Sequence, residues 1–551
     1  MNRRAVSGTM LILVLTGMLT LAFNIQQVEA SGTIFIRADG SVEPSTAPIS
    51  TVDNVTYIFT GNIYDEVVVE RSNITIDGNG YMLQGSGSGC GFYCFGINNV
   101  TTKNTNIKNF RGGILLVSSS NNSIAGNNVA NNEQGIWLYS SSNNSIAGNN
   151  ATNNWYGILL DSSSNNSISG NNITANNELG IGLGIWLYYS SSNNSISGNN
   201  VANNNIGIEL HSSSNNSIVG NNITANNGNG ISLYHSSNNS ISGNNAANNG
   251  NGIGLIGMPS SPSNNSIVGN NATNNGSGIN LYSSSNDSVA GNNVANNGFG
   301  ISLYSSSNES ISGNTVANNM HGIGLYLSSS NNSIVGNNIT ANSYKGIGLY
   351  YSSSNNSISG NNVANNNIGI ELHSSSNNSI YHNNFINNLR QVRDYAWDFP
   401  SETPSINTWD GSYPSGGNYW SDYEERYPDA EELDGSGIWD TPYVIDEDNQ
   451  DNYPLMEPWT PTPPIPTTID ELRTETEDLG FEREIDNKGI VKSLLAKLNV
   501  AQKLVENGKI DQAKKILNAF INEVQAQSGK HITPQAADIL IESAKYILSH
   551  L

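Results

Sequence analysis

The chain has 551 residues, more than one ordinary domain needs, so we expect several parts. Its formal net charge is −23, with 45 Asp and Glu residues against 22 Lys and Arg. This acidic balance argues against nucleic-acid binding, because phosphate contacts need clustered basic side chains. More than half of the carboxylates lie between residues 394 and 486, so the acidity belongs to one segment of the chain.

The N-terminus has the features of a secretory signal peptide. Arg3 and Arg4 form a basic start, residues 10–23 form a short apolar run, and Val-Glu-Ala at 28–30 resembles a cleavage site. A membrane anchor is the alternative, but the run is short for a span. We therefore predict a signal peptide over residues 1–30 and an exported protein. No later stretch is long and apolar enough to cross a membrane.

Residues 31–112 are expected to form an N-terminal cap and the first coils of the repeat that follows. The chain's two cysteines, Cys90 and Cys94, lie in this segment. In an exported protein they either close a small disulfide loop or remain two small apolar side chains. We predict the disulfide, with a structural role.

Residues 113–389 consist of a repeated unit that reads G-I-x-L-Y-x-S-S-N-N-S-I-x-G-N-N-x-x-x-N-N. Most steps between its Gly-Ile starts are 22 to 24 residues. Each unit holds three apolar pulses that are too short for helices, and the I-x-L pulse alternates with the period of a strand. One unit cannot bury its own apolar face, so neighbouring units must stack. The repeat therefore predicts a mainly β protein, a parallel β-helix with three strands per coil.

Asparagine explains the turns between these strands. Its short amide tolerates the left-handed backbone conformation and bonds to nearby backbone groups. At a fixed repeat position, asparagines of successive coils also form amide ladders.

The repeats, together with the segments 35–42 and 73–81, resemble the NosD-type family of carbohydrate-binding and sugar-hydrolase β-helices found in archaeal and bacterial surface proteins. The resemblance implies right-handed coiling. Some members of that family are linked to copper delivery, but the Met320-His321 pair stands without other Met, His or Cys residues near it in sequence.

Residues 390–458 are an acidic segment rich in Trp and Tyr, and similar segments close the β-helix in archaeal members of this family. A solenoid needs its open end covered, so capping is the predicted role. The stretch 434–440 resembles a calcium loop, because oxygen ligands alternate there with glycines. The candidate ligands are Glu432, Asp434, Ser436 and Asp440. Either they bind calcium or they form an acidic, solvated loop, and the serine at 436 weakens the calcium reading.

Residues 459–486 are predicted to be a Pro-rich and acidic linker. Residues 487–551 show helical periodicity in three stretches, and Thr533-Pro534 suits the start of the last helix. This part resembles the FIMAH module, a small helical domain appended to exported proteins. The resemblance supplies no catalytic residues, and we expect the module to bind another surface component.

The candidates for catalysis in the repeat are few. Asp287 and Glu309 replace the same asparagine in consecutive units, so stacking brings them to a spacing that a glycosidase would need. The position is a polar turn, however, and we expect both acids to point into water. Glu209-Leu210-His211 and Glu371-Leu372-His373 belong to a duplicated run, but the copies lie too far apart to share a site.

The residue after I-x-L forms a tyrosine column, with Trp137 and Trp186 at the outward x position. Asp161, His211 and His373 interrupt the column. Stacked rings beside Ser and Asn side chains would form a platform for sugar rings, or the rings would only stabilise one another. The column consists of Tyr139, Tyr188, Tyr234, Tyr282, Tyr304, Tyr326 and Tyr350.

The sequence thus predicts a secreted or cell-surface β-helix that binds polysaccharide or envelope glycans, or serves as a structural or adhesive element of the envelope. One alternative is an enzyme that acts on polysaccharides as a lyase, epimerase or hydrolase. The other is an accessory protein for copper. Calcium is the one cofactor that the residues suggest.

Overall fold

The computed structural model describes residues 32–176, 182–257, 262–399, 401, 403–460, 468–481 and 483–551. The expected signal peptide, residues 1–30, lies outside this range. The chain divides into two compact units, Met1–Trp459 and Thr460–Leu551. Among the helices of the described part, none combines the length and apolar character that a membrane span requires.

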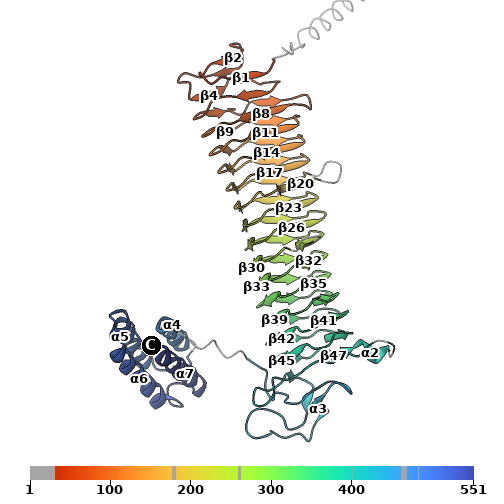
Figure 1. Ribbon diagram of the computed structural model, residues 1–551, viewed down its shortest axis with the longest axis vertical. Coiled ribbons are helices and arrows are strands. Elements are labelled where there is room, and N and C mark those ends of the chain that lie inside the picture. Colours follow the sequence, from red (N-terminus) through yellow and green to blue (C-terminus); the bar gives the residue numbers. More distant parts are fainter. Residues whose placement is uncertain are drawn as a thin grey trace, which may run out of the picture. The chain divides into compact units, whose positions relative to one another are not determined.

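The first unit is a parallel β-helix, as the repeat predicts (Figure 1). Each coil contributes one strand to each of three parallel sheets, for example β14 (Gln134–Tyr139) to sheet A, β15 (Ser145–Ala147) to sheet B and β16 (Asn150–Thr152) to sheet C. Successive coils pair in register, so that Ile136 lies beside Ile158. Sheet B extends to β45 (Ser379–Tyr381) and sheet C to β46 (Asn384–Ile386).

Sheet A carries the longest strands and, as shown below, the outward side chains of interest. Its six-residue strands are β8 (Cys90–Phe95), β11 (Gly112–Val117), β14 (Gln134–Tyr139), β17 (Tyr156–Asp161), β20 (Leu183–Tyr188), β23 (Ile206–His211), β26 (Asn229–Tyr234), β29 (Asn251–Ile256), β32 (Ser277–Tyr282), β35 (Phe299–Tyr304), β38 (His321–Tyr326), β41 (Lys345–Tyr350) and β44 (Ile368–His373). The five-residue strand β47 (Arg390–Asp394) follows β44.

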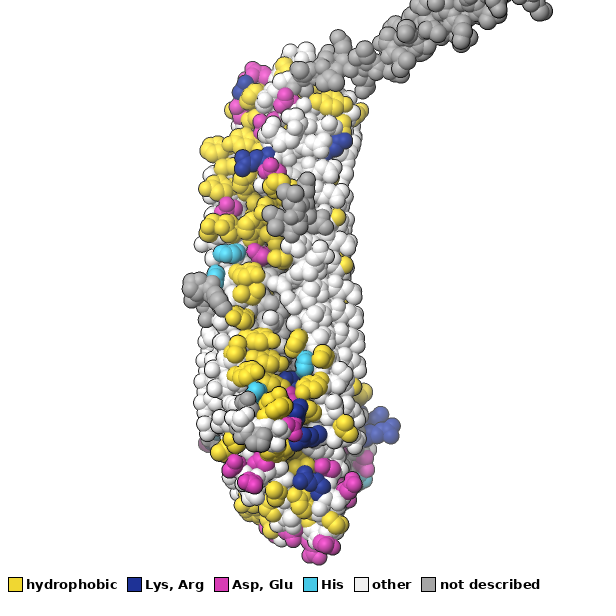
Figure 2. Space-filling model, turned by 90° about the vertical axis from the view of Figure 1, so that its right-hand side faces the viewer, with side chains coloured by type: hydrophobic (Ala, Val, Ile, Leu, Met, Phe, Trp, Pro, Cys, Tyr) yellow, Lys and Arg dark blue, Asp and Glu magenta, His cyan; other side chains and the backbone are white. Residues whose placement is uncertain are grey.

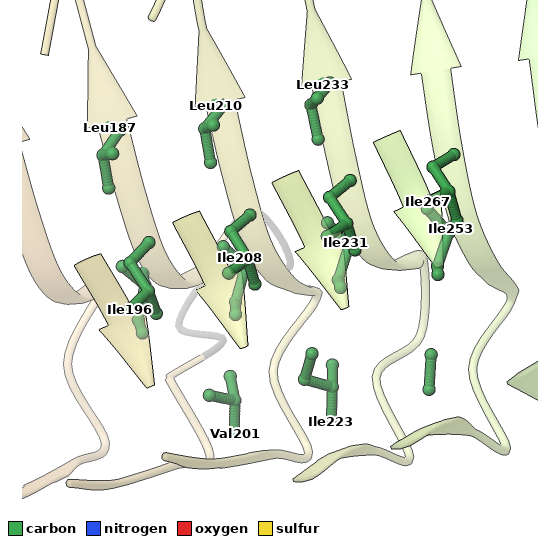
Figure 3. Close-up of a cluster of buried hydrophobic side chains, with 14 of the residues drawn as sticks. Leu187, Ile196, Val201, Ile208, Leu210, Ile223, Ile231, Leu233, Ile253 and Ile267 are labelled. Carbon is green, nitrogen blue, oxygen red and sulfur yellow. The ribbon is translucent and has the colours of Figure 1, made fainter. Parts of the chain in front are cut away.

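The core is a narrow column of aliphatic side chains between the three sheets. Sheet A contributes the Ile and Leu of each I-x-L, sheet B an Ile, and sheet C a Val, Ile or Ala. Figure 3 shows this pattern for successive coils, with Leu187, Ile196 and Val201 pointing toward one another from the three sheets. These side chains are fully buried, so each coil depends on its neighbours for its apolar contacts.

The two adjacent asparagines of each S-N-N-S turn perform different tasks. Asn143 has a φ of 59° and is exposed, as a turn residue should be. Asn144 is buried, and its Nδ2 donates both to Asn166 Oδ1 of the next coil at 3.1 Å and to Ser119 O of the preceding coil at 3.1 Å. The predicted amide ladders are therefore real and lie inside the rod.

The segment after the last coil closes the end of the rod. The strand β48 (Tyr419–Trp420) extends sheet C, and the Trp420 ring stacks on Phe385 of the last coil at 4.6 Å. Each buried ladder ends on a side-chain acceptor near this end. The last donors and their acceptors are Asn407 N with Asn449 Oδ1, Asn418 N with Asp451 Oδ2, and Asn388 Nδ2 with Gln391 Oε1.

The N-terminal coils correct the expected disulfide. Cys90 and Cys94 are both free and lie on one strand, β8. Four steps along an extended strand separate their Cα atoms by about 13 Å, whereas a disulfide needs less than about 7 Å. Cys94 is buried in the core, and burial raises the pKa of its thiol to about 12. The pair behaves as two small apolar side chains, and the disulfide prediction is wrong.

The second unit is a helical domain built from α4 (Ile469–Phe481), α5 (Lys488–Glu506), α6 (Ile510–Gln527) and α7 (Pro534–His550). Thr533 caps α7, since its Oγ1 accepts from Ala536 N at 3.3 Å. The sequence predicts only the last three helices. The first, α4, lies in the stretch taken as linker, and its Leu472 and Leu479 are buried in the same core as Leu494.

Candidate functional site

The outward face of sheet A differs in chemistry from the rest of the rod. In β14, Ile136 and Leu138 point into the core, while Trp137 and Tyr139 point outward. Figure 2 shows such large apolar and aromatic side chains gathered into a stripe along one face of the rod, whose other visible surface is mostly small and polar. We call this set the aromatic stripe: Trp137, Tyr139, Tyr156, Trp186, Tyr188, His211, Tyr234, Tyr282, Phe299, Tyr304, His321, Tyr326, Tyr350, His373 and Tyr395.

In its downstream half, the stripe is a stack of rings that cover one another. Tyr304 and Tyr326 have centroids 4.8 Å apart and planes within 14°, and Tyr326 and Tyr350 follow at 5.1 Å and 13°. His373 contacts Tyr350 edge-on at 5.9 Å and stacks on Tyr395 at 4.5 Å. His373 replaces tyrosine at the column position, as the sequence indicates, and its ring continues the stack to Tyr395 of α2 (Tyr395–Asp398).

Small residues at the fourth strand position allow these rings to lie across the sheet. A Cβ added to Gly324 would lie 2.5 Å from Cε2 of Tyr326, and one added to Gly348 would lie 2.7 Å from Cε2 of Tyr350. Ser302 is likewise covered and 2% exposed. Burial is the main cause that raises the pKa of Tyr326. The downstream rings thus mainly cover the outer surface of sheet A.

In two upstream strands, β14 and β20, tryptophan occupies the fourth position, and in β14 the tyrosine ring stands away from the sheet. Tyr139 is 44% exposed, and its neighbours in the column are Val117 and Asp161, neither of which covers its ring with another aromatic face. Trp137 meets Tyr139 edge-on at 6.4 Å and 74°. The ring faces in these coils are thus less occupied than those downstream.

A second group of upstream rings surrounds Trp186. Its centroid lies 5.1 Å from that of Tyr156 and 4.5 Å from that of Tyr188. The indole N–H of Trp186 and that of Trp137 have no hydrogen-bond partner among the described residues. Polar groups that are buried without a partner are rare in proteins, and each needs an explanation.

The duplicated Glu-Leu-His run occupies two different environments on this face. In the downstream copy, Glu371 is 1% exposed and accepts from Arg393 Nη1 at 2.9 Å and from Tyr344 Oη at 3.2 Å. Lys345 Nζ lies 3.6 Å from its other oxygen, and the Tyr350 hydroxyl also contacts it. Burial lowers the pKa of Lys345 to about 8, against the opposing effect of Glu371.

In the upstream copy, Glu209 lies between Trp186 and Ser232 of the adjacent coils and is 9% exposed. Its carboxyl has no hydrogen-bond or ion-pair partner among the described residues. Burial raises the pKa of Glu209 to about 7. Sequence reasoning treated the two copies alike, although a comparison of neighbouring coils would have shown Lys345 beside one and Trp186 beside the other.

The acid pair predicted to splay into water is inside the rod. Asp287 and Glu309 are each 1% exposed, because they replace the buried asparagine of the ladder and not the exposed one. Asp287 Oδ1 accepts from Asn265 N at 2.7 Å, and Glu309 Oε2 accepts from Asp287 N at 2.7 Å. Burial raises the pKa of Asp287 to about 6, and burial with the nearby Asp287 raises that of Glu309 to about 8. The exposed-turn expectation is wrong, and a polysaccharide could not reach either group.

The carboxylates of the expected calcium loop are directed at the protein itself. Glu432 Oε1 accepts from Gly437 N at 2.8 Å, Asp440 Oδ1 accepts from Glu431 N at 3.1 Å, and Asp434 Oδ2 accepts from Tyr413 Oη at 2.6 Å. Within the described ranges, no three His, Cys, Asp or Glu residues gather in a way that suits a metal ion. Calcium binding by this loop, with Ser436, stays a prediction.

A pocket of about 500 Å³ lies where the last strand of sheet A meets the closing segment. It is lined by residues of β47, by Trp397 of α2 and by Glu425 and Arg426 of α3 (Tyr423–Arg426). The guanidinium of Arg426 lies over the Tyr443 ring at 4.3 Å and donates to Val444 O. None of the residues predicted as site candidates lines this pocket.

Comparison with known proteins now places the chain. Residues 49–221, 182–271 and 257–425 match a family model described as periplasmic copper-binding protein (NosD). The chain belongs to the NosD family. A second match, to the FIMAH domain, covers residues 469–549 and so includes α4, which the sequence analysis assigned to the linker. No curated protein matches the chain.

Solved structures similar to this NosD-family chain share its fold. The A-module of the Azotobacter vinelandii mannuronan C-5 epimerase AlgE6 is 15% identical, covers 63% of this chain and 91% of its own, and has a TM-score of 0.36. The periplasmic alginate epimerase AlgG is 16% identical over 63% of this chain and 80% of its own, with a TM-score of 0.32. Pectate lyase Pel9A is 12% identical over 67% and 76%, with a TM-score of 0.23. This likeness concerns the β-helix fold alone.

Proposed function

We propose that this protein is an exported β-helix that binds a linear polysaccharide along the upstream half of the aromatic stripe, in the coils of β14 to β26. One observation carries the proposal. The Tyr139 ring beside Trp137 is 44% exposed, and the indole N–H groups of Trp137 and Trp186 are buried without a partner among the described residues. The downstream rings, in contrast, stack face to face on one another.

The chemistry of a sugar ring suits this surface. A pyranose has an apolar face that an aromatic ring buries, and hydroxyl groups that a neighbouring Ser or Asn can bond. Neighbouring coils lie about 4.8 Å apart, which is close to the length that one sugar contributes to an extended chain. A polysaccharide that runs along the rod would therefore meet one coil per sugar.

The alternatives have less support from the geometry. For an enzyme, the predicted acid pair Asp287 and Glu309 is sealed inside the rod. For copper binding, which the family description suggests, the residues do not fit. The described residues hold no cluster of His, Cys, Asp and Glu, and burial raises the thiol pKa of Cys90 to about 11 and that of Cys94 to about 12, which keeps both thiols protonated.

The test is a glycan array probed with the full-length mature protein and with two variants, Trp137→Ala and Tyr139→Ala. We expect both variants to unfold at the wild-type temperature and to lose binding. Tyr326→Phe is the matched control, because it keeps a downstream ring in place and should bind as the wild type does. If the two upstream variants fold and bind as before, the proposal fails.

A further inference from the structure

We propose that the upstream half of the aromatic stripe selects polysaccharides that carry free amino groups, with Glu209 as the residue that receives the ammonium. The inference rests on the proposed function and names its ligand class. It follows from the place of one carboxyl among rings, from the distribution of charge along the chain, and from the second copy of the same motif.

Glu209 is a carboxyl group placed among aromatic rings. Trp186 and Ser232 flank it in the adjacent coils. The phenols of Tyr156 and Tyr234 are close enough for its charge to raise their pKa, after burial as the larger cause. The side chain is more than nine-tenths buried and has no partner among the described residues. An ionised carboxylate is unfavourable where it is buried without a cation. A ligand that supplies the cation therefore gains binding free energy from the new ion pair and from the removal of this cost.

The upstream coils supply no lysine or arginine to this face; their basic side chains are His211 and His235, and burial, followed by the nearby His235, lowers the pKa of His211. Residues 112–344 contain no Lys or Arg at all. The nearest one, Arg111, is paired with Glu133 at 3.6 Å. Asp161 adds a second carboxylate in the tyrosine column, where its Oδ1 accepts only from its neighbour Ser162 at 2.9 Å. The field over the upstream coils therefore favours a cationic ligand and disfavours a uronate polymer.

The downstream copy of the motif shows how an ammonium occupies such a place. There, Lys345 Nζ lies 3.6 Å from Glu371 Oε2 and 3.6 Å from the centroid of the Tyr350 ring. One ammonium thus contacts a carboxylate and an aromatic face together, and both contacts favour the cation. Upstream, Glu209 lies beside the Trp186 ring, and Leu183 occupies the strand position that Lys345 has downstream, so no ammonium of the protein meets this carboxyl.

The experiment is isothermal titration calorimetry of the full-length mature protein at about pH 7, close to the pKa of Glu209, with three oligosaccharides of equal length: a 1,4-linked glucosamine oligomer, the same oligomer after N-acetylation, and a uronate oligomer. We expect the amine form to bind at least about tenfold more tightly than the acetylated form, as a charge-assisted contact predicts, and the uronate form to bind least.

Two variants assign the selectivity. Glu209→Gln should lower the affinity for the glucosamine oligomer about tenfold and leave that for the acetylated oligomer unchanged, and Asp161→Asn should act in the same direction. The control, Asp287→Asn, makes the same change in net charge inside the rod and should leave both affinities unchanged.

The outcomes separate this inference from the proposed function. If the acetylated and amine forms bind equally and Glu209→Gln changes neither affinity, the amine inference is wrong while glycan binding stands. If the uronate oligomer binds most tightly, the inference is also wrong. If none of the three binds and the glycan array is blank, the proposed function itself fails.

Discussion

The two halves of the aromatic stripe use the same repeat position for different purposes. Upstream, Trp137 fills the fourth strand position and leaves the Tyr139 ring standing in solvent. Downstream, Gly324 and Gly348 leave room for the rings of Tyr326 and Tyr350 to lie across the sheet and stack. The neighbouring side chain at the fourth strand position thus distinguishes a tyrosine ring that stacks on its neighbours from one that remains exposed. Four changes test this contrast.

The largest expected effect concerns the acid pair in the ladder between the two halves. Both carboxyls have a pKa above its ordinary value in the folded protein, about 6 for Asp287 and about 8 for Glu309. Below about pH 4 both carboxyls are mainly protonated in the folded and in the unfolded protein, so their stabilising contribution is intact. It is lost as the pH rises from about 4 through the two folded-state values, because the unfolded chain ionises first.

The double change Asp287→Asn with Glu309→Asn restores the amide ladder and removes this titration. At about pH 9 we expect it to raise the free energy of unfolding by on the order of 5 kcal/mol, with little change at about pH 4. Denaturant unfolding at both pH values measures the difference. An equal gain at the two pH values would show that the acids do not carry the pH dependence.

The second effect compares the two copies of the Glu-Leu-His run. Glu371→Gln leaves Lys345, which is 3% exposed, without its carboxylate, and we expect a loss of about 4 kcal/mol. Glu209→Gln removes a buried carboxyl that has no partner among the described residues and whose pKa burial raises to about 7, so at about pH 9 the free energy of unfolding should rise, by on the order of 2 kcal/mol. Urea unfolding of the two variants side by side provides the measurement. Equal losses would mean that Glu209 has a partner of its own.

The third comparison separates the structural role of the downstream rings from the proposed glycan binding by the upstream rings. Tyr326→Ala removes a ring from the downstream stack and should cost about 3 kcal/mol, less than a fully buried ring because its edge is exposed. It should not change glycan affinity. Tyr139→Ala should weaken glycan binding and leave the free energy of unfolding nearly unchanged. Thermal unfolding and calorimetric titration on both variants test this, and a loss of binding with Tyr326→Ala would extend the glycan site downstream.

The smallest effect converts an upstream coil into a downstream one. Trp137→Gly should let the Tyr139 ring fold across the sheet, as Tyr326 does over Gly324, at a cost of about 1 kcal/mol for glycine in a strand. The rate at which Tyr139 is nitrated should fall, and binding should weaken. An unchanged nitration rate would show that the fourth residue does not set the position of the ring.

The fold follows from the sequence because each repeat residue has one role that recurs in every coil. The site follows only in part. The two asparagines of a turn look alike in sequence, and only packing reveals that Asn144 faces inward and Asn143 outward, which is why Asp287 and Glu309 were placed on the wrong side. Contacts between coils decide which tyrosines stand free. Likewise, Leu472 and Leu479 mark α4 only after the other helices give them a core.

The buried ladders also have a direction. Asn144 Nδ2 donates a hydrogen bond to Asn166 Oδ1, and this series ends on Asn449 in the closing segment. Each coil therefore presents hydrogen-bond donors on one side and acceptors on the other, and these match the donors and acceptors of any other coil. Whole coils can be added by duplication, or deleted, without a new kind of contact between neighbouring coils. The length of the aromatic stripe can thus change in steps of one coil, while both closing segments stay as they are.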